Sequence, residues 1–187
     1  MSLLAVQGGA TGTGTVTLLA PITNTDRTLT LPDATGTVLT TATAGVPING
    51  PAFSAYQSSS QTLSSSTLTK IQFQTEEYDT NSAFDNATNY RFTPLVAGYY
   101  VVSAAVKANT VNTTGRINIF KNGASYKFGM ATGGVGGTTG TFAMSCQVYL
   151  NGATDYIECY ALFADGQALS AAIDQTYFQA AMVRSAV

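Results

Sequence analysis

The sequence predicts an all-β protein, an antiparallel β-sandwich, and three observations carry this prediction. Residues 98–106 place large apolar side chains on both faces of one extended segment, as in a strand that is buried on both sides. Asn122 and Gly123 stand between two alternating segments, which is typical of a tight β-hairpin. A further apolar segment at 178–183 closes the pattern, and no stretch shows helical periodicity.

The expected strands follow one another with room only for turns and loops. Residues 52–56 contain the first aromatic side chains, and a Ser/Gln-rich loop follows at 57–66. Pro94 and Gly98 predict a corner before the long strand, because proline is excluded from central strands and glycine permits sharp turns. The expected strands are 52–56, 68–76, 90–93, 98–106, 116–121, 125–130, 141–150, 156–163 and 176–183.

Composition divides the chain into two parts near the Gly/Pro-rich stretch 45–51. All ten Tyr and all nine Phe follow this stretch, so only residues 48–187 contain the side chains needed to fill a core. Residues 1–47 alternate Thr with Gly, Val and Leu, are interrupted by prolines and lack aromatic residues. We expect an extended β-rich arm or shaft there, in which three copies wind together and attach to a larger particle.

The charge content predicts a symmetric oligomer. Charged residues make up 10% of the chain, against about 25% in ordinary soluble domains, while hydrophobic residues make up 45%. Neutral polar residues suit interfaces in which a desolvated charge would be costly. A net charge of -2 with scattered cations argues against nucleic-acid binding. The absence of a long apolar run argues against membrane insertion, and the start of the chain lacks the pattern of an export signal.

The segment 12–39, GTGTVTLLAPITNTDRTLTLPDATGTVL, resembles a segment common in tail-fibre and other virion structural proteins of tailed bacteriophages. The resemblance implies a virion component, assembled in the host cytoplasm and exposed on the particle surface. It does not distinguish a tail fibre from a head fibre, spike or other structural protein.

A second resemblance covers the C-terminal domain and rests on the order of several motifs. Ala52-Phe-Ser-Ala is followed by Phe92-Thr-Pro, then by Gly98-Tyr-Tyr, Lys121-Asn-Gly and the strand that begins at Phe178. This order resembles the complement-one-q and tumour-necrosis-factor-like jelly roll, a family of trimeric binding heads. The resemblance implies a jelly-roll head over 48–187 and a homotrimer, with the Thr/Gly arm in place of a collagen-like stalk.

The strand 98–106 supplies the main candidates for the trimer interface. Tyr99 lies on one of its faces, and Tyr100 and Val102 lie on the other. One face can fill the core while the other meets a neighbouring subunit; the alternative is that a second sheet and a covering loop bury the strand within one chain. Tyr160 and Phe178 are added because the resemblance places their strands along the threefold axis.

The residue inventory argues against catalysis. The chain has no histidine, which removes the usual general base, and with two cysteines it makes a zinc site implausible. Two of the carboxylates Glu76, Glu77 and Asp79 could form a catalytic acid/base pair. A solvated loop edge explains these three residues better. Glu77, Asp79 and Asp85 are calcium candidates, since carboxylate oxygens suit that ion, but their spacing matches no known calcium motif. No cofactor is expected.

Cys146 and Cys159 flank the turn 151–154 at equal distances, so a hairpin centred there would place them opposite each other. A cross-strand disulfide or redox pair is one interpretation. Two buried thiols that act as small apolar fillers are the other, which the absence of an export signal favours.

A Gly/Thr-rich loop at 129–140 interrupts the second half of the domain. It lacks the Lys and the helix of a phosphate-binding loop. It is either a connection between strands or, as loops on rigid sandwiches often are, a contact surface for a receptor. The receptor-contact candidates in it are Gly133, Val135, Thr138 and Thr139.

These observations together predict a non-enzymatic phage fibre or fibre-tip protein. The arm at 1–47 would attach a homotrimer to the tail or capsid, and the head would bind a glycan or protein of the host cell surface. A purely structural capsid decoration or neck fibre without a receptor is the first alternative. A polysaccharide depolymerase is the second, disfavoured because the chain is short and its carboxylates are few.

Overall fold

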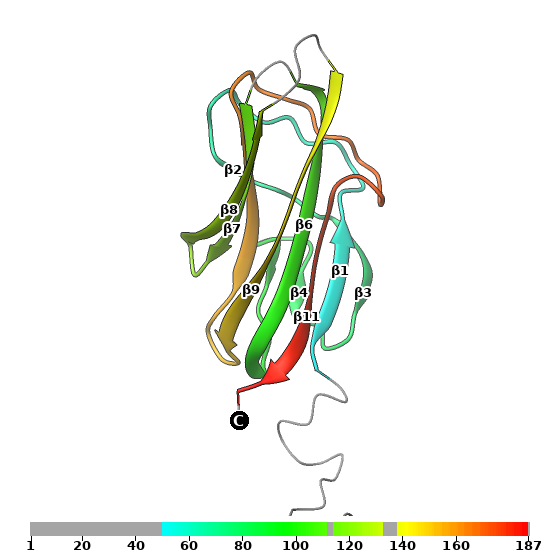
Figure 1. Ribbon diagram of the computed structural model, residues 1–187. Helices are drawn as coiled ribbons and strands as arrows, with labels where there is room; N and C mark the ends of the chain where they lie inside the picture. Colours follow the sequence, from blue (N-terminus) through cyan, green and yellow to red (C-terminus); the bar gives the residue numbers. More distant parts are fainter. Residues whose placement is uncertain (1–49, 112–113, 133–137, 187) are drawn as a thin grey trace, which may run out of the picture. The chain divides into compact units, whose positions relative to one another are not determined.

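The computed structural model describes residues 50–111, 114–132 and 138–186. These ranges form two antiparallel β-sheets packed face to face, and they contain no helix and hence none that could cross a membrane (Figure 1). The all-β sandwich predicted from the sequence is confirmed. The predicted arm at 1–47 lies outside the described residues.

The first sheet has five strands in the order β3-β1-β11-β6-β9. Its long strands β6 (Ala97–Val111) and β9 (Thr138–Asn151) are paired, and β11 (Tyr177–Ser185) lies on the other side of β6. β1 (Ala52–Tyr56) pairs with β11, and β3 (Thr75–Asp79) forms the edge. β11 therefore lies within this sheet between β1 and β6, as Figure 1 shows.

The second sheet has six strands, and β10 is its centre. β7 pairs with β10 along one side, while β5 and β2 pair with different parts of its other side. The strands are β2 (Thr69–Lys70), β4 (Phe84–Asp85), β5 (Arg91–Phe92), β7 (Thr114–Lys121), β8 (Ala124–Thr132) and β10 (Ile157–Phe163).

Aromatic rings join the two sheets. Phe53 of the five-stranded sheet stacks on Phe84 and Phe92 of the six-stranded sheet, with ring centroids 4.6 and 4.5 Å apart. Phe178 meets the edge of Phe53 at 5.0 Å. All four rings are buried, and burial of each side chain stabilises the fold by roughly 1.5–3 kcal/mol. These four phenylalanines thus belong to one core that both sheets share.

The hairpin at Asn122 and Gly123 is confirmed. It joins β7 to β8, and both residues have positive φ, 53° and 77°, as a two-residue hairpin turn of this type requires. The expected strand at 68–76 is divided between the two sheets, because β2 pairs with β10 whereas β3 pairs with β1. Between them Ile71 and Phe73 remain fully buried in the core.

The expected hairpin at 151–154 is wrong. β9 belongs to the five-stranded sheet and β10 to the six-stranded sheet, so this turn carries the chain across the sandwich. The turn is built around Asn151, whose Oδ1 accepts hydrogen bonds from the N–H groups of Ala153, Thr154 and Asp155 at 3.0, 2.9 and 2.9 Å. An Asn side chain that satisfies three successive amides favours a compact turn whichever sheets it connects.

Candidate assembly surface

The outward face of the five-stranded sheet carries a block of nine uncharged side chains, which we call the central face. Its members lie opposite one another in the register of three neighbouring strands, and they alternate with core residues because successive side chains of a strand point to opposite sides. Most are small, so another chain can approach this sheet closely. The central face comprises Val101, Ser103 and Ala105 of β6, Ala143, Ser145 and Gln147 of β9, and Tyr177, Gln179 and Ala181 of β11.

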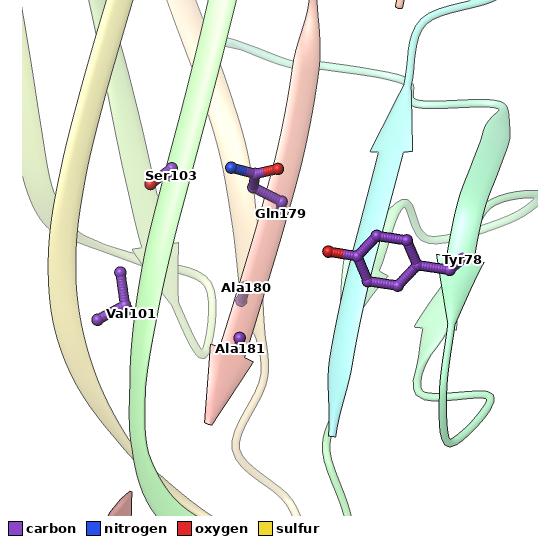
Figure 2. Close-up of a pocket in the computed structure, with 6 residues that line it drawn as sticks. All are labelled: Tyr78, Val101, Ser103, Gln179, Ala180 and Ala181. Atoms are coloured by element: carbon purple, nitrogen blue, oxygen red, sulfur yellow. The ribbon is translucent and has the colours of Figure 1, made fainter. Parts of the chain in front are cut away.

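A shallow hollow of about 150 Å³ lies on this face. Figure 2 shows Tyr78 reaching from β3 across β1, with its hydroxyl group toward β11, where Gln179 and Ala181 lie. The Tyr78 side chain is 51% exposed, while the small residue opposite it on β1, Ser54, is buried. The hollow therefore has one aromatic wall, and Val101, Ser103 and Ala181 give it a floor of small side chains.

Beside the central face stands an aromatic ridge formed by Tyr99 of β6 and Tyr149 of β9. The two residues are directly opposite each other, their ring centroids are 5.4 Å apart, and they are 46% and 41% exposed. Lys121 supports Tyr149, since its Nζ donates a hydrogen bond to the Tyr149 carbonyl oxygen at 2.7 Å. One sheet face thus presents both a ridge and a hollow.

The five residues predicted for the trimer interface do not lie on one surface. Tyr99 faces outward on the five-stranded sheet. Tyr100, Val102 and Phe178 are completely buried in the core of the single chain, which corrects their assignment to the interface. The Tyr100 hydroxyl donates to the Val96 carbonyl oxygen at 2.7 Å, and burial raises the pKa of Tyr100 to about 12.

Tyr160, the fifth candidate, belongs to the other sheet. It lies on β10 and stacks on Phe120 of β7 at 4.1 Å, on the outward face of the six-stranded sheet. An interface through the central face would not include it. The correction follows from strand order, because β10 and β11 are in different sheets although both follow β9 in the sequence.

The structure also corrects the calcium candidates. The described residues contain no group of three or more His, Cys, Asp or Glu side chains placed to hold a metal ion. Glu77 accepts a hydrogen bond from the Ser54 hydroxyl at 2.7 Å, and Asp79 accepts one from the Phe84 N–H at 2.7 Å. Asp85 accepts N–H groups of its own loop, beginning with Thr88 at 2.8 Å, and these bonds lower its pKa to about 2. Each carboxylate therefore organises local backbone or side chains instead of a shared site.

The two cysteines are free thiols, and the expected opposition across a hairpin is wrong because their strands lie in different sheets. Cys159 is completely buried in the core, and Cys146 is partly buried and packs against the core cluster. Burial raises the pKa of both thiols. The interpretation as small apolar fillers fits this placement.

The receptor-contact candidates fall at the edge of the described chain. Thr138 and Thr139 are in β9, not in a loop, and Thr138 pairs with Val111 of β6. Gly133 and Val135 lie outside the described residues.

Sequence reasoning missed the partners of Tyr99. Tyr149 and the small residues of β9 and β11 were not singled out, although the period of two was visible in 143–149, where Ala, Ser, Gln and Tyr alternate with apolar side chains. A face of small residues gives a weaker hydrophobic pattern than a face of large ones, so the sequence pattern favours the large side chains of Tyr100 and Val102.

Neither a protein-family model nor a curated protein matches this chain. Solved structures match its fold. Murine APRIL at pH 5.0 has a TM-score of 0.57 with 11% identity, over 72% of this chain and 99% of the APRIL chain. The Eiger TNF of S. frugiperda has a TM-score of 0.60 with 10% identity, over 76% of this chain and 96% of that one. At such identities the likeness establishes the fold alone, which is a tumour-necrosis-factor-like jelly roll.

Proposed function

We propose that this chain is a non-enzymatic virion protein of a tailed bacteriophage, a fibre or fibre tip, whose head forms a homotrimer through the central face. The carrying observation is the central face itself, nine residues without a formal charge on three adjacent strands. Depletion of charge at the centre of a surface distinguishes interfaces from ordinary protein surface.

The ridge and the hollow support a ring-shaped assembly. A contact in which the ridge of one copy enters the hollow of the next is head-to-tail, and such contacts close into a ring when the rotation permits. Tyr99 and Tyr149 would supply the aromatic anchors, a residue type that dominates the energy of many interfaces. In a closed ring of three copies, the ridge of every head enters the hollow of the next head. No central face then remains exposed to water.

The placement in a virion rests on the segment 12–39, whose amino-acid sequence resembles segments of phage structural proteins. The arm at 1–47 attaches the trimer to the particle, and the head faces outward and binds a glycan or protein of the host. Three weak sites on one trimer act together, so avidity replaces any chemical step. The chain has no histidine, which supports a binding role over an enzymatic one.

Sedimentation equilibrium of the full chain at micromolar concentration tests the assembly. The expected mass is three times the 19.4 kDa of one chain, and a compact single chain would refute the trimer. Deletion of residues 1–47 tests the arm, because the head should remain folded and trimeric but no longer enter particles.

Binding of the full chain to host cells tests the role of the head. Binding that saturates supports a receptor-binding fibre. Efficient incorporation into particles without any cell binding would instead support the capsid decoration or neck fibre. Release of oligosaccharides from host capsule would overturn the non-enzymatic assignment.

A further inference from the structure

The outward face of the six-stranded sheet contains a small pocket beside Arg116. Arg116 of β7 lies opposite Leu162 of β10, and the two line a depression of about 270 Å³ together with Thr114, Gly115 and Ala164. This volume is near the lower limit of ligand pockets, roughly 300 Å³. Its size suits one small ring, and most of its lining is apolar or aliphatic.

The charge of Arg116 is not neutralised by the protein. In the described part of the chain no carboxylate forms an ion pair with it, and its Nε is buried without a hydrogen-bond partner. Lys70 and Lys121 of the same sheet differ, since they pair with Glu158 at 2.5 Å and Asp155 at 2.8 Å. Within these residue ranges the Nη groups of Arg116 thus have no carboxylate partner, and they can meet an anion from outside the protein.

An aromatic ring borders the guanidinium group. The Phe128 ring centroid is 5.8 Å from Cζ of Arg116, and the Phe128 side chain is 58% exposed on the edge strand β8. Stacking on an aromatic ring orients an arginine while leaving the edge of its fork free for a carboxylate. Phe128 also offers an apolar surface on which a flat ligand can pack.

An unpartnered acceptor lies beneath this ring. Asn118 is the next outward residue of β7, between Phe128 on one neighbouring strand and Tyr160 on the other. It is 1% exposed, its Nδ2 donates to the Ser125 hydroxyl at 3.0 Å, and its Oδ1 has no partner among the described residues. A buried acceptor without a donor is costly, so a ligand hydroxyl that reached it would be favoured. Asn118 does not line the depression, so in this structure a ligand that occupies the depression does not reach it.

We propose that this pocket binds an acidic sugar, a hydroxylated ring that carries a carboxylate. The carboxylate receives two hydrogen bonds from the Arg116 fork, and the apolar face of the ring packs on Phe128 and Leu162. The inference rests on the proposed function, in which the head binds a host surface molecule, and it names the chemical class of that molecule. The pocket is on the sheet opposite the central face, so trimer formation leaves it open.

The test compares two probes that differ only in the acidic group, methyl β-D-glucuronide and methyl β-D-glucoside, by calorimetric titration of the full chain. We expect the glucuronide to bind at least about tenfold more tightly, since a charge-assisted bidentate pair has a strength of that order. Arg116→Gln should remove the preference, Arg116→Lys should retain part of it, and Phe128→Ala should weaken both probes. Arg91→Gln is the matched control, because Arg91 stacks on Tyr156 at 4.5 Å on the same sheet but does not line the pocket.

Equal affinity for the two probes, or an unchanged preference in Arg116→Gln, would overturn the site. An equal loss in Arg91→Gln would also overturn it, because the effect would then come from net charge. The same samples are examined by sedimentation. A trimer that binds neither probe refutes this site and leaves the assembly intact, whereas a monomer that prefers the glucuronide supports the site and refutes the trimer.

Discussion

Asn122 and Asp155 fasten together two turns that are distant in the sequence. Asn122 Nδ2 donates to Asp155 Oδ1 at 2.8 Å, and the N–H of Tyr156 donates to Asn122 Oδ1 at 3.0 Å. Lys121 Nζ lies 2.8 Å from Asp155 Oδ2. The tip of the β7–β8 hairpin is thereby held against the turn that carries the chain between the two sheets.

Asp155→Ala should lower the free energy of unfolding by about 2–3 kcal/mol, because Lys121 loses its ion-pair partner and Asn122 Nδ2 loses its acceptor in a partly buried site. Urea unfolding of the full chain measures the change. Asp174→Ala is the control, since Asp174 is exposed, and it should change stability by less than about 0.5 kcal/mol. Equal losses in the two variants would show that the contacts of Asp155 with Lys121 and Asn122 do not contribute to stability.

Gly152→Ala should destabilise the turn between the sheets more than Gly123→Ala destabilises the hairpin. Both glycines have positive φ, 69° and 77°, which disfavours alanine by about 1 kcal/mol. A Cβ on Gly152 would also lie 2.2 Å from the backbone nitrogen of Ala97, whereas on Gly123 its nearest neighbour would be 3.5 Å away. We expect a loss of at least about 3 kcal/mol for Gly152→Ala. Similar losses in thermal unfolding would contradict the steric argument.

The strands could be predicted because their pattern is local, whereas the partners of each strand could not. The alternation around Tyr99 and the Asn122-Gly123 turn are visible in the sequence, and both are confirmed. The same reasoning allows a hairpin with Cys146 opposite Cys159, because nothing local distinguishes a turn within a sheet from a turn between sheets. Strand pairing depends on contacts far apart in the chain, such as that of β1 with β11.

The candidate surfaces were predicted less well than the fold. A strand that is apolar on both sides indicates that one side packs in the core and the other contacts a further surface. It does not show which side is which. The burial of Tyr100 and Val102 is decided by Phe92 and other rings of the opposite sheet. The lack of an ion-pair partner for Arg116 among the described residues is likewise invisible in the sequence, since it depends on which residues stand opposite it, Leu162 of β10 and Met130 of β8.

Asp85 should make stability depend on pH in the acid range. Its pKa is about 2 in the folded protein, below the ordinary value of 3.8, because backbone N–H groups stabilise the carboxylate. A lowered pKa means that the contribution is complete above pH 3.8 and disappears as the pH falls toward 2. The difference in melting temperature between the parent protein and Asp85→Ala should therefore shrink over this interval. A difference that stays constant from pH 6 to pH 2 would contradict it.

The two thiols should differ in reactivity. Cys159 is completely buried and Cys146 only partly, and the thiolate is the reactive form, so burial protects Cys159 more strongly. Iodoacetamide should modify Cys146 slowly in the native protein and Cys159 only after unfolding. Mass spectrometry of the digested protein distinguishes the two sites. Equal modification under native conditions would show that the core opens on the time scale of the reaction.

The ridge should be required for assembly but not for folding. Tyr99 and Tyr149 are nearly half exposed in the single chain, so Tyr99→Ser with Tyr149→Ser should leave the core folded, while loss of the trimer lowers the melting temperature. Aromatic anchors contribute about 2 kcal/mol or more each, which corresponds to a weakening of roughly 30-fold per residue in the association constant. At low micromolar concentration the double variant should sediment as a single chain. Phe128→Ser removes a still more exposed ring from the opposite sheet and should remain trimeric, because that face lies outside the proposed contact. If the ridge variant stays trimeric while the Phe128 variant dissociates, the interface uses the six-stranded sheet, and the central face is uncharged for another reason.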